Sequence, residues 1–216
     1  EFRRVLFRSV NTLTDGSEYI QTDDNTVDGV IYSMTDLTIN GDGTLNINGK
    51  FKHGIASKDD LVITGGTFNI TAVNDALNGK DCVKIKDGTF KLSATTGNGI
   101  QSKNGDDTTK GYVYICGGDI TVLKSMEGIE GTAIIIEDGK VNVTAEDDGI
   151  NASSGASNEA ETLATEVEPI RTPNETTSKT TDETTNEARQ GGFGGGFGGG
   201  GNAFEVDTNC YLSITG

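Results

Sequence analysis

Hydrophobic residues in this chain recur at every second position, in short runs separated by glycine. Residues 61–72 read LVITGGTFNITA, with such a run on each side of a Gly-Gly pair. Residues 83–94, 113–122 and 134–143 repeat the arrangement. A period of two with Thr, Val and Ile is typical of half-buried strands, and no segment shows a helical period. The pattern therefore predicts an all-β protein.

The paired runs belong to a repeating unit. Each unit starts with a polar, a small and an aliphatic residue, as in Asp148-Gly149-Ile150. These starts are His53, Asp75, Asn98, Glu127 and Asp148. Successive starts lie 22, 23, 29 and 21 residues apart. A period of this size indicates a solenoid, and about 22 residues is too short for a four-stranded propeller blade. We therefore expect a single-stranded parallel β-helix in which inward side chains stack from coil to coil.

The repeat divides the chain into four parts. Residues 1–9 (EFRRVLFRS) lack the pattern and look like a translated adapter or cloning scar. Residues 10–154 form the predicted β-helix, in which an insertion, Asn104–Lys110, explains the 29-residue spacing. Residues 155–203 hold both prolines and the run GGFGGGFGGGG, which predicts a disordered acidic, Thr-rich and Gly-rich insertion. Residues 204–216 resume the strand pattern and predict the start of a further, truncated coil.

Composition narrows the range of partners. The formal net charge of -16 argues against nucleic acid or an anionic membrane, and it fits a neutral polymer or bound cations. Three cysteines without CxxC spacing and a single His argue against a zinc site and do not indicate a disulfide framework. Alternation places Cys82 and Cys116 at outward positions. No hydrophobic run is long enough for a transmembrane helix.

Acidic residues gather at the starts of the last predicted coils. Adjacent coils lie about 4.8 Å apart, so equivalent positions become neighbours. The residues brought together are Glu127, Glu130, Asp147, Asp148 and Asn151. Their carboxylates would repel one another without a cation, and Ca²⁺ takes about six to eight oxygen ligands. The sequence therefore predicts Ca²⁺ at this cluster, with a solvated acidic corner as the alternative.

A weaker group of the same kind lies two coils earlier. Its members are Asn74, Asp75, Asn78 and Asn98. Their oxygen atoms predict a second Ca²⁺ position. The alternative is that the Asn side chains cap turns.

Two further sets of residues are candidates for contact with sugars. Lys80 and Lys103 follow their coil starts by five residues and neighbour acidic residues, which favours an exposed ladder of alternating charge. The functional alternative is donation to sugar hydroxyls, or action as a base whose pKa is lowered by nearby Ca²⁺. Tyr112 and Tyr114 are expected to point outward, where they would stack on polysaccharide or pack against the 104–110 insertion.

Several stretches resemble one known family. DLTINGDGTLNING, HGIASKDDLVITGGTFNITA, NDALNGKDCVKIKDGTFKLSA and EDDGINAS are similar to the bacterial carbohydrate-binding β-helix family typified by a cellulose-binding surface protein of clostridia. The resemblance covers roughly residues 28–153 and resumes at Phe204. It implies a right-handed parallel β-helix, bound Ca²⁺, and binding of cellulose and pectic polymers. It also implies an extracellular, cell-surface location in Gram-positive bacteria.

The same fold occurs in calcium-dependent pectate lyases. Some of these hold the ion with an Asp-Asp-x-x-Asp string and an acid from the preceding coil. Asp147-Asp148-x-x-Asn151 with Glu127 is similar, with Asn in place of the last Asp, whereas Asn74-Asp75-x-x-Asn78 departs further. The lyases also need a placed Lys base.

Three functions follow from these observations. The first is a non-catalytic, Ca²⁺-stabilised β-helix that binds plant cell-wall polysaccharide. The second is a calcium-dependent polysaccharide lyase in which Lys80 or Lys103 acts as the base. The third is a structural cell-surface solenoid without a ligand.

Overall fold

A computed structural model describes residues 3–20, 26–107, 109–153 and 211–214. The chain divides into one unit of residues 1–170 with 206–216 and a second of residues 171–205, and every described residue belongs to the first. The described residues form strands, turns and bends without a helix, which confirms the all-β prediction. Among them no helix is therefore available to cross a membrane.

The coils formed by β3–β5, β6–β8 and β9–β11 each contain three parallel strands, and every unit begins with a strand that the sequence pattern does not predict. The additional strand is short and lies at the start of each repeating unit. These strands are β3 (Gly29–Ser33), β6 (His53–Ser57), β9 (Leu77–Gly79), β12 (Ile100–Ser102), β14 (Ile129–Gly131) and β16 (Ile150–Ala152). They form a 6-stranded sheet in which each strand pairs with its counterpart in the next coil. Sequence reasoning missed them because four of the six, β9, β12, β14 and β16, have three residues each, which are too few to show a period of two.

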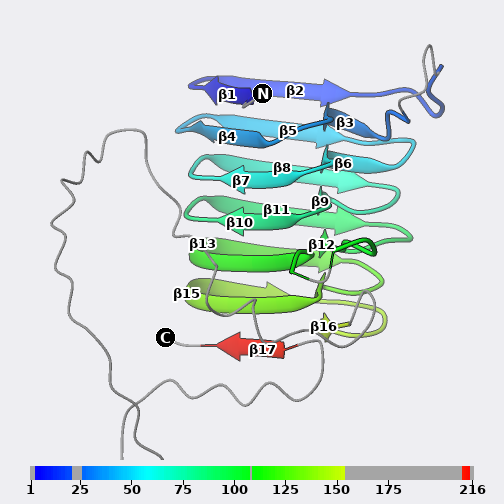
Figure 1. The fold of residues 1–216 in the computed structure, drawn as a ribbon. Coiled ribbons are helices and arrows are strands. Elements are labelled where there is room, and N and C mark those ends of the chain that lie inside the picture. The colour runs from blue at the N-terminus through cyan, green and yellow to red at the C-terminus, as the bar shows by residue number, and fades with distance from the viewer. Residues whose placement is uncertain (1–2, 21–25, 108, 154–210, 215–216) are drawn as a thin grey trace, which may run out of the picture. The chain divides into compact units, whose positions relative to one another are not determined.

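The two predicted runs of each unit form the remaining strands. The first runs are β4 (Leu37–Gly41), β7 (Asp60–Ile63) and β10 (Cys82–Ile85), and the second runs are β5 (Thr44–Asn48), β8 (Thr67–Ala72) and β11 (Thr89–Ala94). In the later coils both runs are continuous, as β13 (Tyr112–Lys124) and β15 (Ala133–Val143). These long strands join both series into one 11-stranded sheet, and the result is the predicted parallel β-solenoid (Figure 1).

The ends of the solenoid differ in part from expectation. β1 (Arg3–Phe7) pairs with β4 and β2 (Val10–Thr14) pairs with β5, so the pairing includes residues that the sequence analysis excluded as a cloning scar. A backbone with free N–H and C=O groups extends a parallel ladder whatever the origin of its sequence. β17 (Tyr211–Ile214) pairs with β15, with Leu212 opposite Ile134. The predicted disordered insertion, residues 155–203, lies outside the described residues.

The core is a set of inward columns that run along the solenoid. Phe68 and Phe90 are 0% and 1% exposed, and their rings stack with centroids 4.9 Å apart and planes at 4°. Leu45 lies before them in the same column and Ile120 after them. Both Phe are therefore inward in adjacent coils, as the alternation predicts.

Glycine occupies the corner between the two predicted runs because the backbone there has positive φ. The φ angles are 138°, 114°, 131°, 97° and 101° at Gly41, Gly66, Gly88, Gly118 and Gly139. Glycine adopts this region without the steric cost of a Cβ atom. Gly66, Gly88, Gly118 and Gly139 stack on one another in successive coils, so the same corner repeats there, whereas Gly41 lies opposite Gly65.

The 104–110 insertion is tied to the solenoid by polar contacts. Asn104 is buried, donates to Asp81 Oδ1 at 2.7 Å, and accepts from the backbone N–H groups of Asp106 and Asp107. Lys110 forms an ion pair with Asp81. The extra residues thus form a local turn beside β10 without interrupting the strand ladders.

Candidate functional site

Three of the predicted ligands meet where the last coils begin. Glu127 lies just before β14, and Asp147 and Asp148 lie just before β16. Backbone bonds hold the two segments in register, with Gly128 N–H donating to Asp148 O at 2.9 Å. Each of the three side chains offers a carboxylate oxygen, and these oxygens all lie within 4.8 Å of one another. We call this group the Glu127 cluster.

Within this cluster, one oxygen of Glu127 has no hydrogen-bond partner in the part of the chain that the structure describes. Its Oε1 accepts from Asn151 Nδ2 at 2.9 Å, but its buried Oε2 accepts from no donor among the described residues. Burial raises the pKa of Glu127, and the nearby carboxylates of Glu130 and Asp148 raise it further against the opposing effect of Asn151. A buried carboxylate oxygen without a donor is costly, and a cation is one way to satisfy it.

Glu130 does not share this role, although the sequence grouped it with Glu127. Its Oε2 accepts from Asn98 Nδ2 at 2.7 Å and Gln101 Nε2 at 2.5 Å, and its Oε1 accepts from Lys103 Nζ at 3.1 Å and Ser153 Oγ at 2.9 Å. Burial acts to raise its pKa, but these donors outweigh burial and hold the pKa below its usual range. Glu130 is thus a satisfied internal acceptor rather than an open ligand.

The second predicted cation position is occupied by internal hydrogen bonds. Asp75 is 1% exposed and accepts from Asn98 N–H at 2.9 Å and from Asn78 Nδ2 at 2.7 Å. His53 Nδ1 lies 3.1 Å from Asp75 Oδ2. The Asn74 and Asp75 oxygens also lie so close to Gly97 that a Cβ there would come within 2.2 Å and 2.5 Å of them. The geometry therefore does not favour the predicted second Ca²⁺ position.

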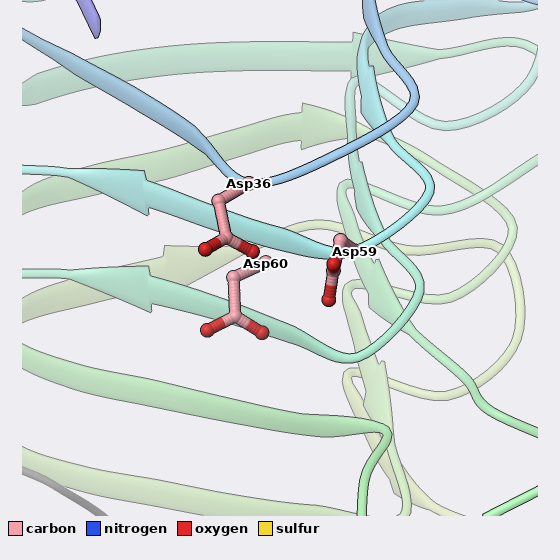
Figure 2. Close-up of side chains that lie close together, drawn as sticks. All are labelled: Asp36, Asp59 and Asp60. Carbon is pink, nitrogen blue, oxygen red and sulfur yellow. The ribbon is translucent and has the colours of Figure 1, made fainter. Parts of the chain in front are cut away.

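A different acidic group forms where the sequence analysis placed none. The carboxylates of Asp36, Asp59 and Asp60 lie within 4.8 Å of one another, and all three side chains are half-buried (Figure 2). Asp36 and Asp60 come together because each immediately precedes one of two paired residues, Leu37 and Leu61. Burial raises the pKa of Asp59 to about 6, with further contributions from Asp81 and Asp36. The sequence signal that could have revealed this acidic group is Asp36, which lies one coil before the Asp59-Asp60 pair.

The two lysines proposed as a base are both ion-paired. Lys80 Nζ lies 2.9 Å from Asp106 Oδ2, and Lys103 Nζ lies 3.1 Å from Glu130 Oε1. The hydrogen bond to Asp106 and its negative charge raise the pKa of Lys80. A general base needs the opposite shift, so the ion pair with Asp106 does not favour Lys80 as the base.

The expected exposed aromatic platform is absent from the described surface. Tyr114 is buried at 7% exposure, and its hydroxyl donates to Glu137. Tyr112 is half-buried, with Lys84 Nζ 5.3 Å from the centre of its ring. Cys82, also expected to point outward, is 0% exposed, and burial raises the pKa of its thiol. Alternation gave the direction of these side chains but not the neighbours that cover them.

A protein-family model decides the wider relationship of this repeat. The model is described as a carbohydrate-binding domain-containing protein, and it matches residues 5–198. The chain belongs to this family. The match includes strands β2 to β16 and the Glu127 cluster.

The chain is also similar to a curated protein and to a protein of solved structure. A carbohydrate-binding domain-containing protein of Acetivibrio thermocellus is 42% identical over 64 residues, which cover 29% of this chain and 22% of that protein. The solved structure of a polysaccharide lyase-like protein from C. thermocellum, a gadolinium derivative, is similar with a TM-score of 0.64 and 33% identity. That similarity covers 68% of this chain and 60% of the solved chain.

Proposed function

We propose that the chain is an extracellular, non-catalytic carbohydrate-binding solenoid that binds plant cell-wall polysaccharide, either cellulose or a pectic glycan. The observation that supports glycan binding is the family match over residues 5–198. An extracellular or cell-surface location is part of the proposal, because such polysaccharides lie outside the bacterial cell. Binding to insoluble cellulose and to immobilised pectin tests it. A solenoid that acts only as a spacer would bind neither.

The proposal includes one Ca²⁺ ion at the Glu127 cluster. Glu127, Asp147 and Asp148 would supply carboxylate oxygens, and Asn151 would orient Glu127 through its hydrogen bond. Asp147 and Asp148 are exposed, so water can complete the coordination shell of a flexible oxygen site. The unpartnered Glu127 Oε2 supports a cation at this position. The ion would offset the repulsion among the carboxylates and stabilise the last two coils.

Thermal melts in chelator and in excess Ca²⁺ test the metal site. At Ca²⁺ about 100 times its dissociation constant, binding to the folded state alone adds about 2.7 kcal/mol of stability. Mg²⁺ should give a smaller gain, because it requires tighter octahedral geometry and retains its waters. Asp148→Ala should abolish the gain, whereas Asp42→Ala, which removes an exposed acid at another corner, should leave it intact. An unchanged melting temperature, or equal gains in both variants, would contradict the assignment.

The alternative function is a calcium-dependent polysaccharide lyase, favoured by similarity to the polysaccharide lyase-like protein. The reaction would remove the proton next to a uronate carboxylate and eliminate the adjacent glycosidic oxygen. The ion pairs of Lys80 and Lys103 leave neither amine free to accept that proton. Incubation with polygalacturonate, monitored in the ultraviolet for unsaturated product, separates this function from simple binding. We expect no product.

A further inference from the structure

Side chains at the starts of successive coils hold the backbone of the next coil. Asp75 Oδ1 accepts from the backbone N–H of Asn98 at 2.9 Å, and Asn98 Oδ1 accepts from the backbone N–H of Glu127 at 3.1 Å. In each step the acceptor side chain and the donor backbone belong to equivalent residues of adjacent coils. We call these two bonds the coil-start ladder.

The coil-start ladder ends at Glu127, although the backbone of the next coil lies in the same register. Gly128 N–H donates to Asp148 O, just as Gly99 N–H donates to Glu127 O one coil earlier. A third step would join the Glu127 side chain to the backbone N–H of Asp148. Glu127 does not make this bond, because its Oε1 accepts from Asn151 and its Oε2 accepts from no residue in the described ranges.

Side-chain length explains why the ladder ends at this residue. Asp and Asn carry their oxygen atoms on Cγ, whereas Glu carries them on Cδ, one carbon further from the backbone. The shorter side chains of Asp75 and Asn98 suit the distance of about 4.8 Å between adjacent coils. The additional methylene of Glu127 places its carboxylate beside those of Asp147 and Asp148 instead. The interruption therefore leaves a carboxylate oxygen available within the Glu127 cluster.

Asn98 holds Glu127 from the preceding coil through an amide that is bonded at both ends. Asn98 is 6% exposed, and its Nδ2 donates to Glu130 Oε2 at 2.7 Å while its Oδ1 accepts from Glu127 N–H. The partners determine the orientation of this amide, because a backbone N–H only donates and an ionised carboxylate only accepts. Asn98 therefore fixes the backbone of Glu127 and keeps the Glu130 carboxylate hydrogen-bonded outside the cluster.

We propose that Asn98 is a positioning residue for the cation at the Glu127 cluster, and that the interrupted coil-start ladder leaves Glu127 free to bind this cation. The inference rests on the proposed Ca²⁺ site and adds a residue that does not touch the ion. It also changes the role of Asn98, which the sequence analysis grouped with the ligands of a second Ca²⁺. Removing a residue that orients a metal ligand typically weakens metal binding about 10–100-fold.

Isothermal titration of the full chain with Ca²⁺ tests the role of Asn98. Asn98→Ala should weaken Ca²⁺ binding about tenfold or more. Gln101→Ala is the matched control, because Gln101 Nε2 donates to the same Glu130 oxygen at 2.5 Å but the side chain makes no hydrogen bond to Glu127 in the described structure. Each variant removes one donor from Glu130, so both should melt at a lower temperature in chelator. Only Asn98→Ala frees the Glu127 backbone, so Gln101→Ala should leave the Ca²⁺ affinity nearly unchanged.

Glu127→Asp tests the interrupted ladder without altering Asn98. The substitution keeps the negative charge and removes one methylene, so the shortened side chain can accept from the backbone N–H of Asp148 as the earlier steps do. The melting temperature in chelator should therefore equal or exceed that of wild type. Added Ca²⁺ should no longer raise it, because the carboxylate is drawn back from those of Asp147 and Asp148.

The outcomes separate this inference from the proposed metal site. If wild type does not bind Ca²⁺, the proposed site itself fails. If wild type binds Ca²⁺ but Asn98→Ala binds it equally well, or Gln101→Ala loses as much affinity, the positioning role is overturned while the Ca²⁺ site stands. If Asn98→Ala does not fold, Glu127→Asp decides: Ca²⁺ affinity equal to that of wild type, or a large loss of stability in chelator, would overturn the inference.

Discussion

Replacing Phe68 with alanine should lower the free energy of unfolding by roughly 3–5 kcal/mol, as large truncations in a packed core do. Phe68 is fully buried, and its ring lies nearly parallel to that of Phe90, with centroids 4.9 Å apart. Loss of that aromatic contact alone accounts for about 0.5–1.5 kcal/mol. The backbones of β5 and β11 are bonded to β8 on both sides, so the cavity cannot close by movement of a strand. The loss should therefore lie in the upper half of the range.

Urea unfolding followed by far-ultraviolet circular dichroism measures this loss, because the chain has no tryptophan for fluorescence. Thr71→Ala is the matched control, since Thr71 lies on the same strand with its side chain exposed. It should change stability by less than about 1 kcal/mol. The double variant with Phe90→Ala gives the coupling energy between the two rings.

A loss below about 1 kcal/mol for Phe68→Ala, or one equal to that of Thr71→Ala, would refute the assigned register. A coupling energy near zero between Phe68 and Phe90 would show that the rings do not interact in solution. Either result would require a different alignment of adjacent coils.

Two further predictions concern a half-buried acid and a crowded glycine. The pKa of Asp59 is raised to about 6 from an ordinary value of 3.8, so between about pH 4 and 6 the folded state keeps a proton that the unfolded state releases. The urea concentration at the unfolding midpoint should therefore fall as pH rises through this range, and Asp59→Asn should reduce the fall. Equal pH dependence in wild type and in the variant would show that Asp59 is not its cause. A Cβ at Gly128 would lie 2.2 Å from Gly149 O and from Val143 Cγ1, so Gly128→Ala should cost about 1–3 kcal/mol. Gly105→Ala, with no atom within 4 Å of its added Cβ, should be nearly neutral in the same unfolding assay, and equal losses would argue against crowding.

The sequence by itself determined the repeat and the direction of most strand residues. A period of two assigns Phe68 and Phe90 to the same face of neighbouring strands, and the recurring Gly88 corner marks where each coil turns. Parallel stacking then brings residues at equivalent positions together. The juxtaposition of Glu127 with Asp147 and Asp148 follows from this rule, as does that of Asp36 with Asp60, which the sequence analysis overlooked.

Only the tertiary structure decided which polar groups remain available. Glu127 and Glu130 are three residues apart and alike in sequence, but Glu130 receives donors from Lys103 one coil before it and from Ser153 one coil after it. Glu127 retains an oxygen to which no described residue donates. Tyr114 points outward as alternation predicts, yet it is covered. A repeat gives the column in which a side chain lies, but its solvation and free hydrogen-bonding capacity depend on rotamers and loops in neighbouring coils, which vary from one coil to the next.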